Sequence, residues 1–271
     1  MSEFEQQRRQ NLLHEDFYFY IQERDAFELS EFTKEINTLK DPYLEPMVDV
    51  YYSQACLAYT AGKPITNVLN NMSQAIEYTK ATISYIERHN KKYPLKPIDA
   101  TIFSKFMETE FLPNIIGLSI LSGRRDWFDT LVTATDLSLW DDTEKTIDSL
   151  IALYRPGYPI TTAITPRTLS FRTPLFKAIH AKTEKATLKN LNDYMYGWYD
   201  GLRKAGDGYI DSHIIQHGDS RDCCSFRGYW CFEAAAVAYL KGIDDTTLHH
   251  YIYYPKDMVN YARSLRVNTH V

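Results

Sequence analysis

Apolar residues recur every three or four positions along most of the chain, which is the spacing of one buried helical face. The clearest run has eight such positions: Ile65, Val68, Leu69, Met72, Ile76, Thr79, Ile83 and Ile86. Pro64 precedes the run and suits a first helical turn, where its missing N–H leaves no helical hydrogen bond unmade. Pro94 follows the run. We therefore predict a helix over residues 64–90.

The same spacing predicts helices along most of the remaining chain. The predicted ranges are 4–23, 28–39, 44–61, 102–122, 125–135, 142–153, 173–181, 184–204, 226–241 and 256–266. Two segments interrupt the pattern: the proline-containing connection Tyr158–Ser170 and the Gly- and Asp-rich loop Asp207–Asp222. The predicted fold class is all-α, with about ten helices in antiparallel pairs and two closely packed helical subdomains. Their predicted boundary near Gly123 gives domains over residues 1–122 and 123–271.

Negative charge is concentrated near the start of the chain. The net charge is −5, and the first fifty residues hold 12 Asp or Glu residues against 5 Lys or Arg residues. This balance argues against direct binding to nucleic-acid phosphates, which requires a high density of basic residues. It is compatible with a basic protein partner and equally with simple solubility. The 21 tyrosines are suited both to a core and to a protein interface, so the tyrosine content does not show whether the protein binds a partner.

The chain carries no segment that suggests export or membrane insertion. Its first ten residues are polar, and no run of about 18 apolar residues occurs. Its four cysteines are Cys56, Cys223, Cys224 and Cys231, and their spacing matches neither a zinc site nor a disulfide framework. We therefore expect a cytoplasmic protein with reduced thiols and no membrane contact.

The C-terminal third contains three short motifs. They are Gly228-Tyr229-Trp230 followed by Glu233 and Ala234, Gly242 followed by Asp244-Asp245, and Tyr254-Pro255 followed by Asp257-Met258-Val259. In this order they resemble the GYW-x-x-E-A, G-x-D-D and Y-P-x-D-[LM]-[VA] motifs of the C-terminal domain of the PoNi family of immunity proteins. Residues 1–122 resemble, more loosely, the domain that precedes it in that family. Cys223-Cys224 and Lys256 depart from the family's usual pattern.

The resemblance implies an all-α protein that binds a polymorphic bacterial toxin delivered by contact-dependent inhibition or type VI secretion. In the best-known branch of the family the toxin is a DNase of the PD-(D/E)XK type. It therefore implies an immunity protein with no enzymatic activity and no cofactor. The expected partner is a basic nuclease domain bound in a 1:1 complex, whose active site or substrate groove the protein occludes.

Two groups of residues have side chains that could serve in catalysis or metal binding, and each also has a structural interpretation. Glu233 follows Trp230 by three residues, and a lone carboxylate among such apolar neighbours is expected to accept structural hydrogen bonds. His213 and His217 have the spacing of a helical zinc pair, but Gly218 indicates a loop, so we predict neither a metal site nor bound zinc. The alternative function is a small α-helical hydrolase or lyase with its site near Glu233 and His213.

Two acidic regions are candidates for binding the toxin. The first is the N-terminal helical segment with Glu15, Asp16, Glu23, Asp25, Glu28 and Glu31. The second is the loop with Asp207, Asp211, Asp219 and Asp222. The loop is the preferred candidate, because binding residues concentrate on loops that a rigid scaffold holds in place. The motif residues Gly228, Tyr229, Trp230, Glu233, Asp244, Asp245, Tyr254 and Pro255 are expected to be structural.

Overall fold

The computed structural model describes residues 2–38, 44–99, 101–103, 110–138, 145–160, 170–206 and 208–268. Every regular element in these ranges is helical, which confirms the all-α prediction. None of the described helices is both long enough and apolar enough to span a membrane. The chain forms two compact units. Unit 1 comprises residues 1–100 and 208–229, and unit 2 comprises residues 101–207 and 230–271.

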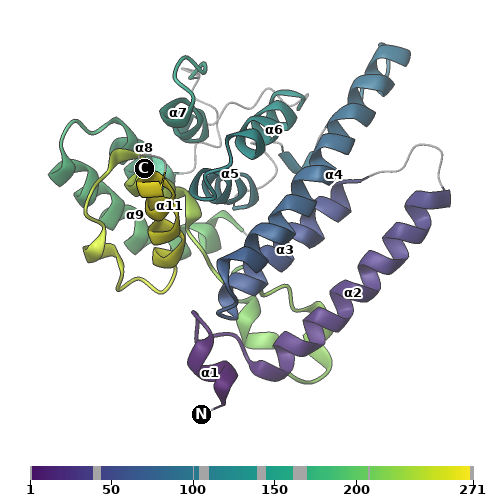
Figure 1. Ribbon diagram of the computed structural model, residues 1–271, viewed down its shortest axis with the longest axis horizontal. Coiled ribbons are helices and arrows are strands. Elements are labelled where there is room, and N and C mark those ends of the chain that lie inside the picture. Colours follow the sequence, from purple (N-terminus) through teal and green to yellow (C-terminus); the bar gives the residue numbers. More distant parts are fainter. Residues whose placement is uncertain are drawn as a thin grey trace. The chain divides into compact units, whose positions relative to one another are not determined.

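Unit 1 contains three long helices and residues 208–229, which come back to these helices from later in the chain and are called the returning segment (Figure 1). The elements are α1 (Glu3–Gln7), α2 (Glu15–Thr38), α3 (Glu45–Thr60), α4 (Ile65–Lys92), η3 (Ser212–Ile215) and η4 (Gly218–Cys223). Helix α3 packs against both α2 and α4. The turn between α3 and α4 is tight: Gly62 has a positive φ of 78°, and an added Cβ there would lie 1.9 Å from the carbonyl oxygen of Gln7. Helices were predicted over 44–61 and 64–90, and the structure has α3 and α4 there, with Ala61 as the C-cap of α3 and Pro64 as the N-cap of α4.

The start of the chain differs from the prediction. One helix was predicted over 4–23 and another over 28–39, whereas α1 ends at Gln7 and α2 then runs unbroken from Glu15 to Thr38. The intervening residues bond to other parts of unit 1. The backbone N–H of Arg9 donates to the carbonyl of Thr60, and the Gln10 side chain bonds to both the N–H and the carbonyl of Tyr229. These tertiary bonds replace the helical ones.

Unit 2 contains the remaining elements. They are η1 (Thr101–Phe103), α5 (Phe111–Leu121), α6 (Arg125–Asp136), α7 (Lys145–Tyr154), η2 (Ser170–Arg172), α8 (Thr173–His180), α9 (Glu184–Ala205), α10 (Phe232–Lys241), η5 (Thr246–Leu248) and α11 (Lys256–Asn268). All residues of α5 are buried, and Gly117 approaches α10 so closely that a Cβ would lie 2.5 Å from the backbone of Phe232. Helices α5 and α10 therefore form its centre.

These units differ from the predicted division into 1–122 and 123–271. Helix α5 packs in unit 2 because it is apolar on every side and lies against the small residues of α10. Residues 208–229 instead pack in unit 1 with the N-terminal helices. Gly123 does end a helix, with a φ of 71°, but the chain remains within unit 2 there.

Helix α10 begins later than predicted, at Phe232 rather than Phe226. Residues 228–231 have no helical backbone, and the N–H of Cys231 donates to the carbonyl of Tyr253. The Asn114 side chain accepts a hydrogen bond of 2.8 Å from the N–H of Phe232, which satisfies one of the free donors at the start of α10. Trp230 and Glu233 therefore do not share a helical face, and Glu233 lies in the first turn of α10.

Glu233 is an acceptor buried in unit 2. It is 1% exposed, and its Oε1 accepts hydrogen bonds from Tyr194 Oη at 2.8 Å, Trp198 Nε1 at 3.0 Å and Cys231 Sγ at 3.3 Å. Burial raises the pKa of Glu233, against the opposing effects of its own backbone N–H, of the hydrogen bonds from Tyr194 and Cys231, and of the positive charge of Arg172. The carboxyl group thus joins α9 to α10, as expected of a structural acceptor.

A second buried carboxylate joins the other two motifs. Asp245 accepts hydrogen bonds from Tyr254 Oη at 2.6 Å and from the Arg263 guanidinium at 2.7 Å. Burial alone raises the pKa of Asp245, but the hydrogen bonds from Tyr254 and Arg263 outweigh it and hold the pKa below its usual value. Asp244 Oδ1 accepts from the N–H of Thr246, and the carbonyl of Pro255 accepts bonds in the first turn of α11. The motif residues Asp244, Asp245, Tyr254 and Pro255 thus have structural contacts.

We predict that Glu233→Ala lowers the free energy of unfolding by roughly 3 kcal/mol, because the buried donors of Tyr194 and Trp198 lose their acceptor. Glu233→Gln keeps an acceptor oxygen and should cost about 1 kcal/mol at pH 5. Denaturant unfolding monitored by far-UV circular dichroism measures both values. Glu87→Gln, on an exposed position of α4, is the matched control and should change little.

The cost of Glu233→Gln should also depend on pH. Because the pKa of Glu233 is raised above 4.5 in the folded protein, the folded state holds this proton more tightly than the unfolded chain. The resulting stability is complete below the unfolded pKa and is lost as the pH rises through the folded pKa. The difference between wild type and Glu233→Gln should therefore shrink from pH 5 to pH 8. A difference that grows over this range would contradict the assignment.

Candidate functional site

One side of α2 faces solvent and combines aromatic with acidic side chains. Phe19 is 54% exposed and Phe27 is 66% exposed. Glu23 lies four residues from each, so the three side chains share one helical face. The exposed acids Asp16 and Glu31 lie on the same side of the helix. We refer to Asp16, Phe19, Glu23, Phe27 and Glu31 as the α2 face.

The helix that carries the α2 face is strongly negative. Helix α2 contains seven Asp or Glu residues and two Lys or Arg residues, a net charge of −5 that equals the net charge of the whole chain. Of the acids predicted to lie on this surface, Asp25 does not, because it is 1% exposed and pairs with the Arg227 guanidinium at 2.9 Å. The prediction of an exposed Asp25 is therefore wrong. Glu28 lies 3.7 Å from the Arg24 guanidinium on the flank of the helix.

The returning segment of unit 1 lies along one flank of α2. The Asp222 carboxylate accepts a hydrogen bond from Tyr20 Oη, and this bond raises the pKa of Tyr20. The Arg24 guanidinium donates to the carbonyls of Asp222 and Cys224, at 3.1 and 3.3 Å. The Arg221 guanidinium stacks over the Tyr20 ring, 4.3 Å from its centroid. These contacts place Asp222 beside the α2 face.

The aspartates of the predicted loop differ in their surroundings. Asp222 contacts α2 through Tyr20. Asp211 is half-buried and has a positive φ of 69°, in the turn that leads into η3. Asp207 and the side chain of Asp219 lie outside the part of the chain that the structure describes.

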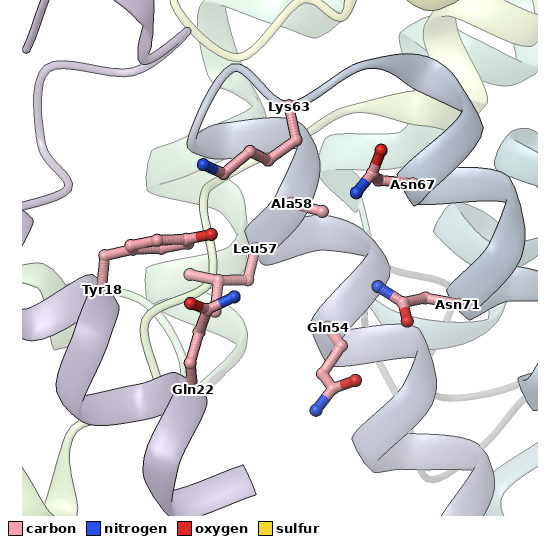
Figure 2. A pocket seen from close by; sticks show the side chains of 8 residues that line it. All are labelled: Tyr18, Gln22, Gln54, Leu57, Ala58, Lys63, Asn67 and Asn71. Atoms are coloured by element: carbon pink, nitrogen blue, oxygen red, sulfur yellow. The ribbon is translucent and has the colours of Figure 1, made fainter. Parts of the chain in front are cut away.

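A polar hollow lies along the opposite flank of α2. Its volume is ≈ 210 Å³. The lining residues are Tyr18, Gln22, Gln54, Leu57, Ala58, Lys63, Asn67 and Asn71 (Figure 2). Tyr18 and Gln22 come from α2, whereas the amides of Gln54, Asn67 and Asn71 come from α3 and α4. Amide groups both donate and accept hydrogen bonds, so this lining suits the backbone or polar side chains of another protein.

His213 and His217 point to different neighbours. His213 Nδ1 lies 3.0 Å from Tyr229 Oη, and its ring packs edge-on against that of Tyr229. His217 Nδ1 lies 3.3 Å from Asp16 Oδ2, and its ring centroid lies 4.5 Å from that of His14. The two histidines therefore do not act as a pair. His14 lies far from His217 in the sequence, so the spacing of histidines along the chain did not predict that these two rings would be neighbours.

The arrangement around Glu233 and His213 gives no support to the catalytic alternative. The Glu233 carboxyl is 1% exposed and enclosed by the groups that donate to it. His213 bonds to Tyr229 within unit 1, whereas Glu233 belongs to unit 2. A general acid or base must reach a substrate proton within hydrogen-bonding distance, whereas the Glu233 carboxyl is enclosed among the residues that the structure describes.

The fold is similar to that of one solved structure, titled the crystal structure of protein PA2201 from Pseudomonas aeruginosa. The TM-score is 0.62, and the match covers 95% of this chain and 91% of that one. The sequence identity is 16%, so the likeness concerns the fold alone. No curated protein matches the sequence.

A family model matches residues 147–258, and its description is PoNe immunity proteins (PoNi), C-terminal. This range contains Tyr194, Trp198, Glu233, Asp245 and Tyr254, whose hydrogen bonds hold unit 2 together. The resemblance inferred from the C-terminal motifs is thus confirmed. Residues 147–258 are therefore similar to the C-terminal domain of the PoNe immunity proteins.

Proposed function

We propose that this protein is an immunity protein that binds a bacterial toxin, a basic nuclease, in a 1:1 complex and covers its substrate groove. The family match of residues 147–258 supports immunity against a toxin. The observation that carries the choice of partner is the α2 face, with two exposed phenylalanines on a helix of net charge −5. A nuclease has a basic groove for phosphates, to which such a surface is complementary.

The α2 face has the composition of an interface that combines anchors with a charged rim. Phe19 and Phe27 each offer an exposed ring, and burying a phenylalanine ring contributes about 2 kcal/mol or more. Glu23, Asp16 and Glu31 surround the rings with negative charge that attracts basic side chains. The rings supply affinity, and the acids speed the encounter between the two proteins.

The two flanks of α2 extend the proposed surface. On one flank, Asp222 acts as an acidic rim, to which Asp211 of the same segment of unit 1 adds a further carboxylate. On the other flank, the polar hollow receives peptide groups of the toxin through its amides. The loop preferred from the sequence thus becomes the edge of the surface, and the α2 face becomes its centre.

The remaining elements of the proposal follow from the family and from the sequence. Neutralisation proceeds by occlusion and requires neither catalysis nor a cofactor. The protein acts in the cytoplasm, where a toxin delivered by type VI secretion or contact-dependent inhibition meets its target. The N-terminal helices α1–α4 act as the partner domain that precedes the C-terminal domain in this family. The acidic surface binds the toxin itself and not nucleic acid.

The double variant Phe19→Ala/Phe27→Ala should retain its fold and lose affinity for the toxin by roughly 30-fold or more, because loss of interface anchors costs about 2 kcal/mol or more. Titration calorimetry with the toxin domain encoded beside the gene measures the affinity, and co-expression measures protection. The matched control is Leu95→Ala/Tyr196→Ala, which removes two side chains that are 94% and 84% exposed elsewhere. Equal affinity of both double variants would place the anchors outside α2.

Reversal of the acidic charges should slow association. We expect Glu23→Lys/Glu31→Lys and, separately, Asp211→Lys/Asp219→Lys/Asp222→Lys to lower the association rate constant and its dependence on salt, with smaller effects on dissociation. Stopped-flow measurements between about 20 and 300 mM salt test this, since screening changes strongly over that range. The control Asp193→Lys/Asp200→Lys alters the net charge on α9 as much as the first variant does on α2.

The rate measurements also separate the two parts of the proposal. If only the α2 variant associates slowly, the loop is not part of the surface. If the α9 control is slowed equally, the effect reflects net charge alone and the location on α2 is wrong. Failure of the wild-type protein to protect cells from the co-expressed toxin would overturn the immunity function itself.

A further inference from the structure

Three side chains of unit 1 that can bind a metal ion converge at the start of α2. His14 immediately precedes the helix, Asp16 lies in its first turn, and His217 comes from the returning segment between η3 and η4. One ligand atom of each residue lies within 4.8 Å of those of the other two. All three residues are exposed, so a hydrated ion can reach them.

The distances suit a small divalent cation. His217 Nδ1 and Asp16 Oδ2 are 3.3 Å apart. Two ligands of a tetrahedral ion with bonds of about 2.0–2.1 Å are separated by roughly the same distance. The His14 and His217 ring centroids are 4.5 Å apart with an interplanar angle of 71°, and one nitrogen of each ring lies within 4.8 Å of the other and of an Asp16 carboxylate oxygen. Two imidazoles and one carboxylate form a ligand set that suits Zn²⁺ and similar ions.

A buried glutamine holds together the two segments that carry the histidines. Gln216 is 1% exposed and directly precedes His217. Its Oε1 accepts a hydrogen bond of 3.0 Å from the N–H of His14, and its Nε2 donates to the carbonyls of Leu12 and His213 at 2.7 Å. The backbones of His14 and His217 are thus fixed before any ion binds. Such preorganisation lowers the entropic cost of gathering the ligands.

We propose that His14, Asp16 and His217 form a surface binding site for one divalent transition-metal ion of the Zn²⁺ type, with the remaining coordination positions open to water. The site links the start of α2 to the returning segment, two parts of unit 1 that are far apart in the sequence. A bound ion therefore stabilises the flank of α2 on which Asp222 lies. The proposal does not depend on the identity of the toxin or on the immunity function.

The test uses the full chain, stripped with EDTA and titrated with Zn²⁺ in a calorimeter. All proteins carry Cys223→Ser, because Cys223 is an exposed thiol close to His217 in the sequence and can itself bind zinc. We expect one equivalent of Zn²⁺ to bind. We expect His14→Ala, His217→Ala and Asp16→Asn each to weaken binding by roughly tenfold or more. Zn²⁺ should also raise the midpoint of thermal unfolding, and the two alanine variants should lose this increase.

Two control variants distinguish this site from other histidines. His250→Ala removes an exposed imidazole in unit 2 and should leave binding unchanged. His213→Ala removes the histidine four positions before His217 and should also leave the affinity unchanged. The proposal is wrong if no stoichiometric Zn²⁺ binds, if His14→Ala binds as tightly as the parent, or if His213→Ala alone abolishes binding. Asp16→Asn keeps the size and helical position of the side chain, so its result does not depend on a change in folding.

Discussion

The arrangement of unit 1 depends on the pair of hydrogen bonds between the side-chain amide of Gln10 and the backbone of Tyr229. Gln10 is buried and satisfies both the N–H and the carbonyl of Tyr229. Close by, the Arg227 guanidinium pairs with buried Asp25 of α2, and the Thr60 hydroxyl donates to the Arg227 carbonyl. Removing one partner of such a buried ion pair is strongly destabilising. These contacts return residues 208–229 to the N-terminal helices and so place the loop, His217 and Asp222 beside α2.

The division between buried and exposed carboxylates explains which residues are structural and which are available for binding. Glu233, Asp245 and Asp25 are all 1% exposed or less, and each accepts hydrogen bonds from aromatic or basic side chains. Their positions are fixed, since an unpaired buried charge is costly. The acids of the α2 face are exposed instead: Asp16 lies 3.3 Å from His217 and Glu31 lies 2.6 Å from Lys34, and these pairs remain open to solvent. The C-terminal motifs that resemble the family therefore describe a core, while the binding surface we propose is centred on α2, outside the matched range 147–258, and includes Asp222 within that range.

The sequence predicted the elements whose signals are local and missed those that depend on distant contacts. Helices α3 and α4 were placed correctly because an apolar period ends at Gly62 and begins again after Pro64. The start of α10 was misplaced because the backbone near Tyr229 bonds to Gln10, which no local pattern reveals. The spacing suggested His213 as a neighbour of His217 and Gly218 argued against that pair, but no local pattern indicated His14, which the fold brings beside His217. Charge composition did indicate the acidic helix, but not that Asp25 turns inward.

Hydrogen–deuterium exchange of the protein, alone and with the toxin domain encoded beside its gene, tests the central claim most directly. The claim is that α2 and the segment bonded to it form the binding surface. It predicts slower exchange on complex formation in peptides that cover residues 15–31 and 208–224, with little change in α9 and α11. Protection confined to unit 2, with unchanged exchange across α2, would contradict it.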